Sequence, residues 1–204
     1  MKKAISVFVT VWAIVVAVIA GGISLGVSQY NQIVRLRTAV DSERAQVATV
    51  LQRRLDLIPN LVETVKGYAA HERATLEAVT KARSDVEQRL KMFAGSSAGE
   101  EKAAMTELLA AQSRLVGSVN EIKVLAERYP DLKANVNFLA LQDQLEGAEN
   151  RISVERQRYS ETVREYNTQI VVFPGNLIAT VCSFASRAYF EEESAAAKAP
   201  QVKF

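Results

Sequence analysis

The chain has 204 residues, 49% of them hydrophobic, with 25 Lys and Arg residues against 23 Asp and Glu residues. Lys2 and Lys3 account for this surplus, so the rest of the chain has no net charge, which argues against nucleic acid as a partner because phosphate binding requires clustered basic residues. A single cysteine, Cys182, excludes an intrachain disulfide and a cysteine-based zinc site.

The first predicted element is a membrane-spanning helix. No charged residue occurs between Lys3 and Arg35, and residues 4–27 are mainly Val, Ile, Ala, Leu, Phe and Trp. A helix that crosses a bilayer core of roughly 30 Å needs about 20 apolar residues. The sequence therefore predicts a single-pass anchor over residues 1–28 and a localisation at the cell membrane.

A cleaved signal peptide is the alternative, with the two lysines as its basic start, residues 5–19 as its apolar segment and residues 18–20 as its cleavage site. The apolar character continues past Ala20 to Val27, which is longer than the roughly 7–15 residues of such signals and favours a retained anchor. The side of the membrane on which the remaining chain lies stays open, because basic residues flank the span at both ends.

Beyond the span, apolar residues recur every three or four positions with hardly any strand-like alternation, which is typical of amphipathic helices. The first stretch continues out of the span without a proline or a linker. A second stretch ends at the Gly- and Ser-rich residues 94–99, and a third begins at Glu100 and Glu101, whose charge suits a helix N terminus. The predicted fold class is all-α.

The fourth stretch has the clearest repeat. Its largest apolar residues fall at intervals of seven, which is typical of the seam of a coiled coil or helical bundle. These residues are Phe138, Leu145, Ile152, Tyr159, Tyr166 and Phe173. With the three preceding stretches they predict an antiparallel four-helix bundle.

Three prolines punctuate the body: Pro59, Pro130 and Pro174 each follow an apolar residue and precede a small or polar residue. Because proline is tolerated in the first turn of a helix but not in its interior, each is predicted to start a new helix. The resulting arms have similar lengths, as an up-and-down bundle requires. At Pro59 the apolar face keeps its phase, so one continuous kinked helix is the alternative.

The end of the chain is predicted to form a short amphipathic helix from Leu177 to Phe190. Within it, Cys182 is expected to be a small, buried or half-buried apolar residue. The sequence thus divides into an anchor at residues 1–28, a helical bundle at residues 29–192 and a disordered tail at residues 193–204.

Several segments beyond the span form a recognisable pattern in their order and spacing. They are residues 30–34, 53–69, 137–139, 141–142 and 149–152, Arg156, Tyr159, residues 166–167, residues 173–176 and residues 189–191. In these segments the chain resembles the LemA family of bacterial membrane proteins. The similarity covers nearly the whole chain after residue 28, and the long run at residues 53–69 is its most specific part.

This resemblance implies one N-terminal membrane helix that carries an antiparallel four-helix bundle, as the periodicity predicts independently. It implies little chemistry, because no enzymatic activity is established for the family and its roles lie in membrane or envelope processes. The chain departs from the family pattern at residues 41–44, where members often have an Ala-Trp pair, and at Ser160, where Asn is usual. A partner surface around residues 41–44 is therefore expected to differ.

Polar residues beside the apolar seam are the candidate site. If they face each other they form a layer in which every charge needs a partner, because an unpaired buried charge is costly. This layer is interpreted as a structural network that fixes helix register, with a binding cleft at one end of the bundle as the alternative. Its members are Arg54, Asp56, Asn60, Glu63, Gln142, Glu149, Asn150 and Arg156.

No enzymatic activity, metal or cofactor is expected. The sequence has no nucleophile elbow, phosphate-binding loop or dinucleotide fingerprint, and its single histidine cannot supply the paired Glu-x-x-His motifs of a di-metal bundle. The leading hypothesis is a non-enzymatic, membrane-anchored scaffold or adaptor, with the lipid bilayer and a membrane or envelope protein as partners.

Two other functions are considered. One is a sensor of a peptide or small ligand, built on the charged residues of the candidate site. The other is a self-assembling membrane structural protein, a homo-oligomer in which Gly22 and Gly26 let neighbouring spans approach closely.

Overall fold

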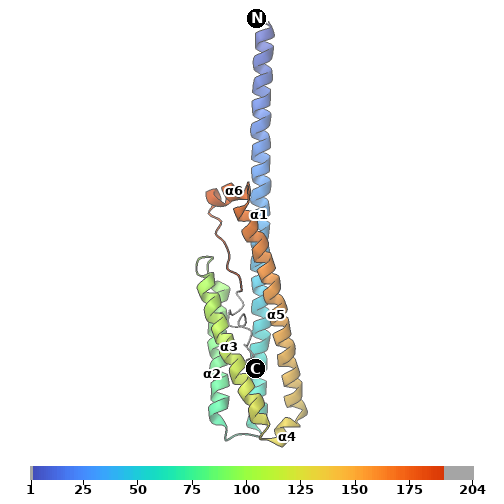
Figure 1. The fold of residues 1–204 in the computed structure, drawn as a ribbon, viewed down its shortest axis with the longest axis vertical. Coiled ribbons are helices and arrows are strands. Elements are labelled where there is room, and N and C mark those ends of the chain that lie inside the picture. The colour runs from blue at the N-terminus through green and yellow to red at the C-terminus, as the bar shows by residue number, and fades with distance from the viewer. Residues whose placement is uncertain (1, 191–204) are drawn as a thin grey trace, which may run out of the picture.

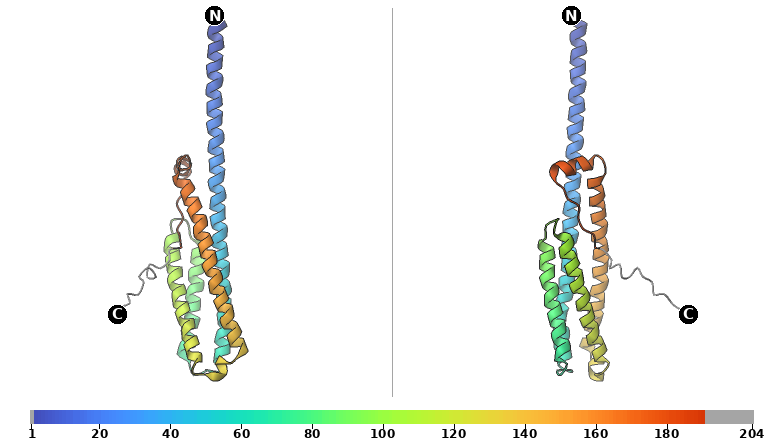
Figure 2. Two further views of the ribbon diagram at one scale, coloured as in Figure 1. Left: turned by 45° about the vertical axis from the view of Figure 1, so that its right-hand side comes forward. Right: turned by 60° about the vertical axis from the view of Figure 1, so that its left-hand side comes forward.

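The computed structural model describes residues 2–190, with side chains from Trp12 onward. Helices α1, α2, α3 and α5 lie side by side and alternate in direction, while α6 lies across the end at which α1 leaves the bundle (Figure 1, Figure 2). The predicted all-α fold, an antiparallel four-helix bundle that follows a long apolar helix, is confirmed. The helices are α1 (Lys2–Lys66), α2 (Arg73–Gly95), α3 (Glu101–Ala126), α4 (Pro130–Lys133), α5 (Val136–Val171) and α6 (Gly175–Cys182).

The N-terminal part of α1 extends away from the bundle (Figure 1). Between Trp12 and Val27 every residue except the half-buried Gly26 is exposed, and the first buried residue after Trp12 is Ile33. This segment is long and apolar enough to cross a membrane. The helix then continues without a break into the bundle, as the absence of a linker predicts.

The prediction of a turn at Pro59 is wrong, because α1 continues through this residue to Lys66. Proline has no backbone N–H, so the carbonyl oxygen of Leu55, four residues earlier, loses its helical donor. Arg83 of α2 replaces that donor: its Nε lies 3.1 Å from the Leu55 oxygen. The chain reverses only at residues 67–72, where the only histidine, His71, lies in a turn.

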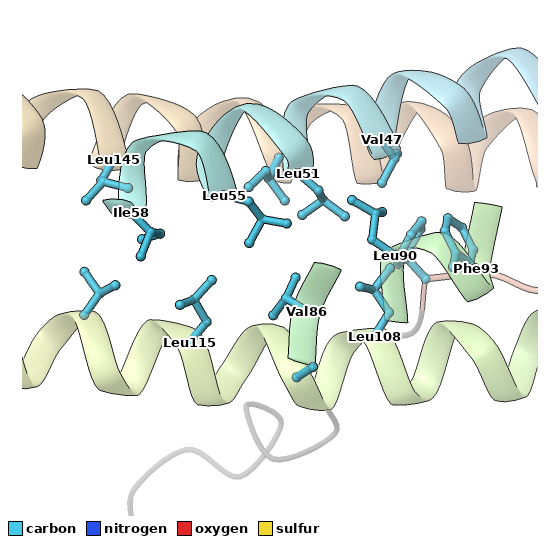
Figure 3. Close-up of a cluster of buried hydrophobic side chains, with 14 of the residues drawn as sticks. Val47, Leu51, Leu55, Ile58, Val86, Leu90, Phe93, Leu108, Leu115 and Leu145 are labelled. Atoms are coloured by element: carbon cyan, nitrogen blue, oxygen red, sulfur yellow. The ribbon is translucent and has the colours of Figure 1, made fainter. Parts of the chain in front are cut away.

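The core is formed by the faces that the apolar periodicity predicts. Buried side chains of four helices meet along the bundle axis (Figure 3), and each large one contributes about 1.5–3 kcal/mol by leaving water. Among the heptad residues, Phe173 is the exception at 78% exposed, because α5 ends at Val171. The labelled core residues are Val47, Leu51, Leu55, Ile58, Val86, Leu90, Phe93, Leu108, Leu115 and Leu145.

The other turn signals are correct. Residues 96–100 connect α2 to α3, and Pro130 is the first residue of α4. Asn135 caps α5, because its side-chain oxygen accepts hydrogen bonds from the backbone N–H groups of Asn137 and Phe138 at 2.9 and 3.0 Å. Pro174 immediately precedes α6.

The end of the described chain differs from the prediction. Helix α6 stops at Cys182, which is exposed rather than buried, and Ser183 follows in the left-handed conformation with φ of 56°. Residues 184–190, here called the strap, are extended rather than helical and run back along the bundle beside α5 (Figure 2). The predicted disordered tail, residues 193–204, lies outside the described residues.

Candidate functional site

The strap is held in place by polar side chains of α5. An extended segment among helices has no neighbouring strand, so its backbone groups need side-chain partners. Asn167 supplies two of them: its Nδ2 donates to the Arg187 oxygen and its Oδ1 accepts from the Arg187 N–H, both at 2.9 Å. The hydroxyls of Tyr166 and Tyr159 donate to the oxygens of Ala185 and Ala188 at 2.9 and 3.1 Å. Four hydrogen bonds therefore fix the strap to one face of α5.

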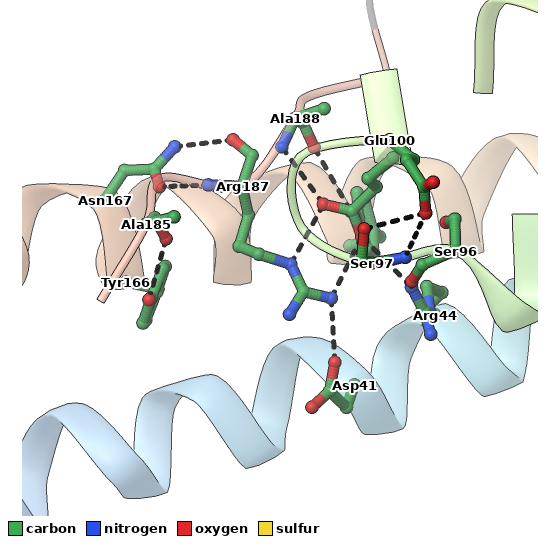
Figure 4. Close-up of polar contacts among 12 residues, drawn as sticks. Asp41, Arg44, Ser96, Ser97, Glu100, Tyr166, Asn167, Ala185, Arg187 and Ala188 are labelled. Atoms are coloured by element: carbon green, nitrogen blue, oxygen red, sulfur yellow. Dashed lines mark hydrogen bonds and ion pairs between the residues drawn. The ribbon is translucent and has the colours of Figure 1, made fainter. Parts of the chain in front are cut away.

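The side chain of Arg187 enters the bundle and forms a two-point ion pair with Glu101, the first residue of α3. Its Nε and Nη2 lie 2.9 Å from the two carboxylate oxygens of Glu101, and Nη2 is also 2.7 Å from Asp41 of α1 (Figure 4). Arg187 is 7% exposed and Glu101 is completely buried. Such a fork-to-carboxylate pair has both strength and directional specificity.

A second arginine completes this cluster. Arg44 of α1 lies 3.4 Å from Glu101 and donates hydrogen bonds to the backbone oxygens of Ser96 and Ala94 at 3.1 and 2.9 Å (Figure 4). Asp41, Arg44, Glu101 and Arg187, here called the strap network, carry two positive and two negative charges. The network therefore neutralises its own charge and connects α1, the α2–α3 turn, α3 and the strap.

The pKa values of the site follow from this arrangement. Burial lowers the pKa of Arg187, but its hydrogen bonds with Glu101 and Asp41 outweigh burial and raise the pKa above its usual value. Burial, reinforced by the negative charge of Glu101, raises the pKa of Tyr159 well above its usual range. The site is thus built to keep its arginine charged and its tyrosine neutral.

Aromatic contacts fix the last residue of the strap. The ring of Phe190 lies 5.8 Å from that of Phe93 in α2 and 5.1 Å from that of Tyr159, measured between centroids. The guanidinium of Arg156 lies 5.3 Å from the centre of the Phe190 ring. Such a contact between a cation and an aromatic ring is worth about 0.5–2 kcal/mol.

Cavities flank the strap on both sides. One of about 300 Å³ lies between the strap and α3 and is lined by Met105, Leu109 and Tyr189 among others. Another, of about 380 Å³, lies beside Phe190 and is lined by Arg156 and Ser160 of α5. The residues around the strap therefore combine buried charge, aromatic surface and open space.

The sequence-predicted polar residues are not joined into one layer. Arg54 and Glu149 do meet: Nη1 of Arg54 lies 2.7 Å from a carboxylate oxygen of Glu149. Arg54 is buried, which lowers its pKa, and the charge of Glu149 partly offsets this effect. Arg156 lies further along α5, against the strap.

The other members of that predicted set lie apart from this pair. Asp56 accepts a hydrogen bond from Gln52 at 2.8 Å, and Glu63 lies 3.5 Å from Lys66 on an exposed surface. The side chains of Asn60 and Asn150 are exposed, whereas that of Gln142 is half-buried. Among the residues with described side chains, no group of three or more His, Cys, Asp or Glu could hold a metal ion.

Sequence reasoning missed the strap network because its members are distant in the chain. From the sequence, Glu101 is expected only to begin a helix, and residues 41–44 appear only as a departure from the family pattern. The available signal was in α5, where Tyr159 and Tyr166 occupy seam positions and carry hydroxyls that need partners when buried. Those partners turned out to be strap carbonyls.

The raised pKa of Tyr159 predicts a loss of stability at alkaline pH. Above a pH of about 10, tyrosine in the unfolded chain loses its proton while buried Tyr159 keeps it, so the unfolded state is favoured as pH rises. We expect the free energy of unfolding to fall by about 1.4 kcal/mol per pH unit for this residue. Urea unfolding of the full chain in detergent micelles, followed by circular dichroism, measures it.

Tyr159→Phe should reduce this alkaline slope, whereas Tyr68→Phe, at a tyrosine that is 44% exposed, serves as the matched control. Equal slopes in the native chain and in Tyr159→Phe would contradict the prediction. Circular dichroism is the suitable signal because the single tryptophan, Trp12, is exposed and precedes the buried part of α1 by about twenty residues.

Comparison with known proteins identifies the family. A search of the curated proteins finds no match. The LemA family profile matches residues 43–204, which include α2, α3, α5, α6 and the strap as well as most of the bundle part of α1. Because this match covers well over half of the sequence, the chain belongs to the LemA family.

Proposed function

We propose that this LemA-family protein is a non-enzymatic, membrane-anchored scaffold or adaptor that presents its helical bundle to another membrane or envelope protein. The observation that carries the proposal is the continuity of α1. One helix contains both the exposed apolar segment and the first arm of the bundle, with no linker between them. The bundle is thereby held in a fixed direction relative to the membrane.

The charge and geometry of the bundle support this proposal. The body of the chain has no net charge, which favours protein and lipid over nucleic acid as partners. The strap network carries equal positive and negative charge, and its groups are engaged with one another and with backbone oxygens. This arrangement suits a fastening role, so we assign no catalytic residue, cofactor or metal.

A sensor of a small ligand or peptide is the second candidate, favoured by the cavity of about 300 Å³ beside the strap. A ligand there would contact the strap backbone and α3 together. None of the residues that line this cavity belongs to the polar set that the sequence predicts. Within that set only Arg54 and Glu149 form an ion pair with each other.

The membrane part of the proposal is tested by topology. In a chain with Cys182→Ser and Ala134→Cys, the new cysteine lies in the exposed turn that directly follows α4, and α4 lies at the end of the bundle far from the anchor (Figure 1). The protein should stay in the membrane fraction after an alkaline wash, with its N-terminal residues intact by mass spectrometry. Labelling by a membrane-impermeant maleimide in intact cells would place the bundle outside the cytoplasm. A chain cleaved near Ala20 and released from the membrane would contradict the anchor.

The scaffold part is tested by crosslinking in native membranes. A photo-crosslinking amino acid at the exposed Val124 or Val154 should yield a discrete adduct with a membrane protein or a second copy. A flexible insertion after Ser28, which keeps anchor and bundle but interrupts α1, should weaken that adduct. Absence of any adduct or self-assembly would contradict the scaffold, and a cavity ligand that protects the strap from hydrogen exchange would favour the sensor.

A further inference from the structure

We propose that α6 and the end of α5 lie in the headgroup region of the bilayer that α1 spans, as a second membrane contact of the bundle. This inference rests on the proposed function, because it needs α1 to be the anchor. The surface concerned, here called the α6 face, consists of Phe173, Leu177 and Val181.

The α6 face is apolar and points away from the bundle. Leu177 and Val181 are spaced by four and line one side of the short helix, where they are 57% and 83% exposed. Phe173, 78% exposed, lies in the turn just before α6. The opposite side of α6 contains Gly175 and Ala179, which are buried. A surface helix of a soluble protein normally turns its apolar residues inward, whereas α6 packs Ile178 against the core and leaves Leu177 and Val181 outward.

The surroundings of the α6 face carry no charge. Residues 166–186 contain no charged residue, and neither do residues 4–34 of α1. These two uncharged segments meet: the rings of Tyr30 and Phe184 lie 5.9 Å apart, and Gln169 donates a hydrogen bond to Gln29 at 2.6 Å. An uncharged surface therefore continues from the anchor onto the end of the bundle.

The contact between α1 and the end of α5 lies where the surface of the bilayer is expected along α1. A core of about 30 Å corresponds to about 20 helical residues at 1.5 Å each, which residues 4–27 supply. The membrane surface then falls near Gln29 and Tyr30, where α1 contacts the end of α5 and the segment after α6. Tyr30, 44% exposed, is an aromatic residue of the kind found at membrane–water interfaces, and Arg35 and Arg37 follow on the aqueous side.

Lipid is the occupant that this geometry favours. The anchor holds the α6 face at the membrane surface whatever else binds, so the apolar stripe meets lipid without a further association step. In Figure 2 α6 lies across the axis of α1 rather than along it, which is the orientation of a helix that rests in the interface plane.

The position of the α6 face is tested by lipid quenching. The full chain is labelled at Cys182, the exposed last residue of α6, with an environment-sensitive fluorophore and reconstituted in phosphatidylcholine vesicles. Two reference proteins combine Cys182→Ser with Val18→Cys in the anchor or with Ala134→Cys at the far end of the bundle. Spin labels on lipid headgroups should quench the Cys182 probe most. Spin labels at the ends of the lipid acyl chains should quench the Val18 probe most. The probe at residue 134 should stay unquenched by either label.

A set of matched substitutions checks that the stripe itself makes the contact. Joint replacement Phe173→Ser, Leu177→Ser and Val181→Ser should clearly reduce headgroup quenching at Cys182, although α1 still holds the end of the bundle near the membrane surface. The control replaces three exposed valines away from the anchor, Val124→Ser, Val136→Ser and Val154→Ser, and should leave that quenching unchanged. Circular dichroism confirms that both variants keep the helical bundle.

The possible failures are distinguishable. If the Cys182 probe stays unquenched while the Val18 probe is quenched deeply, the inference is overturned and the anchor stands. If the Val18 probe is also unquenched, the anchor and the inference both fail. If the Cys182 probe is quenched only by probes on other copies as protein density rises, a second copy covers the α6 face and the inference is overturned.

Discussion

Arg187→Met should lower the free energy of unfolding of the bundle by about 3 kcal/mol, because it removes one partner of a buried ion pair. The methionine keeps an apolar stem but leaves the carboxylate of Glu101, completely buried, without its two closest donors. Arg44, at 3.4 Å, and the backbone N–H of Ala188, at 3.3 Å, remain and limit the loss. Urea unfolding of the full chain in micelles, followed by circular dichroism, measures the change.

The same substitution should release the strap. We expect hydrogen exchange of the Arg187 and Ala188 amides, which donate to Asn167 and Glu101, to become faster in a chain with Arg187→Met while amides in the middle of α5 stay protected. Arg158→Met is the matched control, because Arg158 pairs with Glu155 on an exposed surface and such pairs are worth well under about 1 kcal/mol. Equal effects of the two substitutions would show that the network does not hold the strap.

The double variant Arg187→Met, Glu101→Leu distinguishes the net contribution of the ion pair from the cost of leaving one buried charge without a partner. When both charges are replaced by apolar groups, no buried charge is left unpaired, and such replacements are often nearly neutral. The double variant should therefore be more stable than Arg187→Met alone. If the double variant were less stable by the sum of the two single changes, the ion pair would not be the interaction that matters.

The fold was predictable where local pattern and tertiary packing agree. The seam residues Phe138 to Tyr166 repeat every seven positions within one helix, and burial of one face requires no knowledge of distant residues. Glycine and serine after α2, and Pro130 before α4, act on their own backbone and were equally readable. These features explain why the all-α bundle followed from the sequence.

The strap could not be predicted in the same way. Its apolar residues occur at spacings that also suit a helix, and its extended form depends on partners in α5 and α3 that are distant in sequence. Glu101 and Arg187 are 86 residues apart, so no local period relates them. Of the predicted polar layer, Arg54 and Glu149 met because both lie on faces of α1 and α5 that pack together.

Pro59 does not end α1 for a related reason: a tertiary contact from Arg83 of α2, which is distant in sequence, satisfies the backbone oxygen that the proline leaves without a donor. Pro59→Ala should raise the free energy of unfolding by about 1–3 kcal/mol, because proline costs about 3 kcal/mol more than alanine inside a helix. The new N–H of residue 59 can donate to the Leu55 oxygen, which now receives only the Arg83 side chain. Urea unfolding of both chains under identical conditions gives the difference.

A double-mutant cycle that combines Pro59→Ala with Arg83→Met tests the role of Arg83. In the native chain Arg83→Met leaves the Leu55 oxygen without this donor and should cost about 1–2 kcal/mol, whereas after Pro59→Ala it should cost markedly less. Loss of the half-buried Arg83–Glu87 pair occurs in both backgrounds and cancels in the difference. Strictly additive effects would mean that the Leu55 oxygen is satisfied by another group. A coupling of about 1 kcal/mol would show that a contact from α2 allows α1 to pass a proline and continue to Lys66.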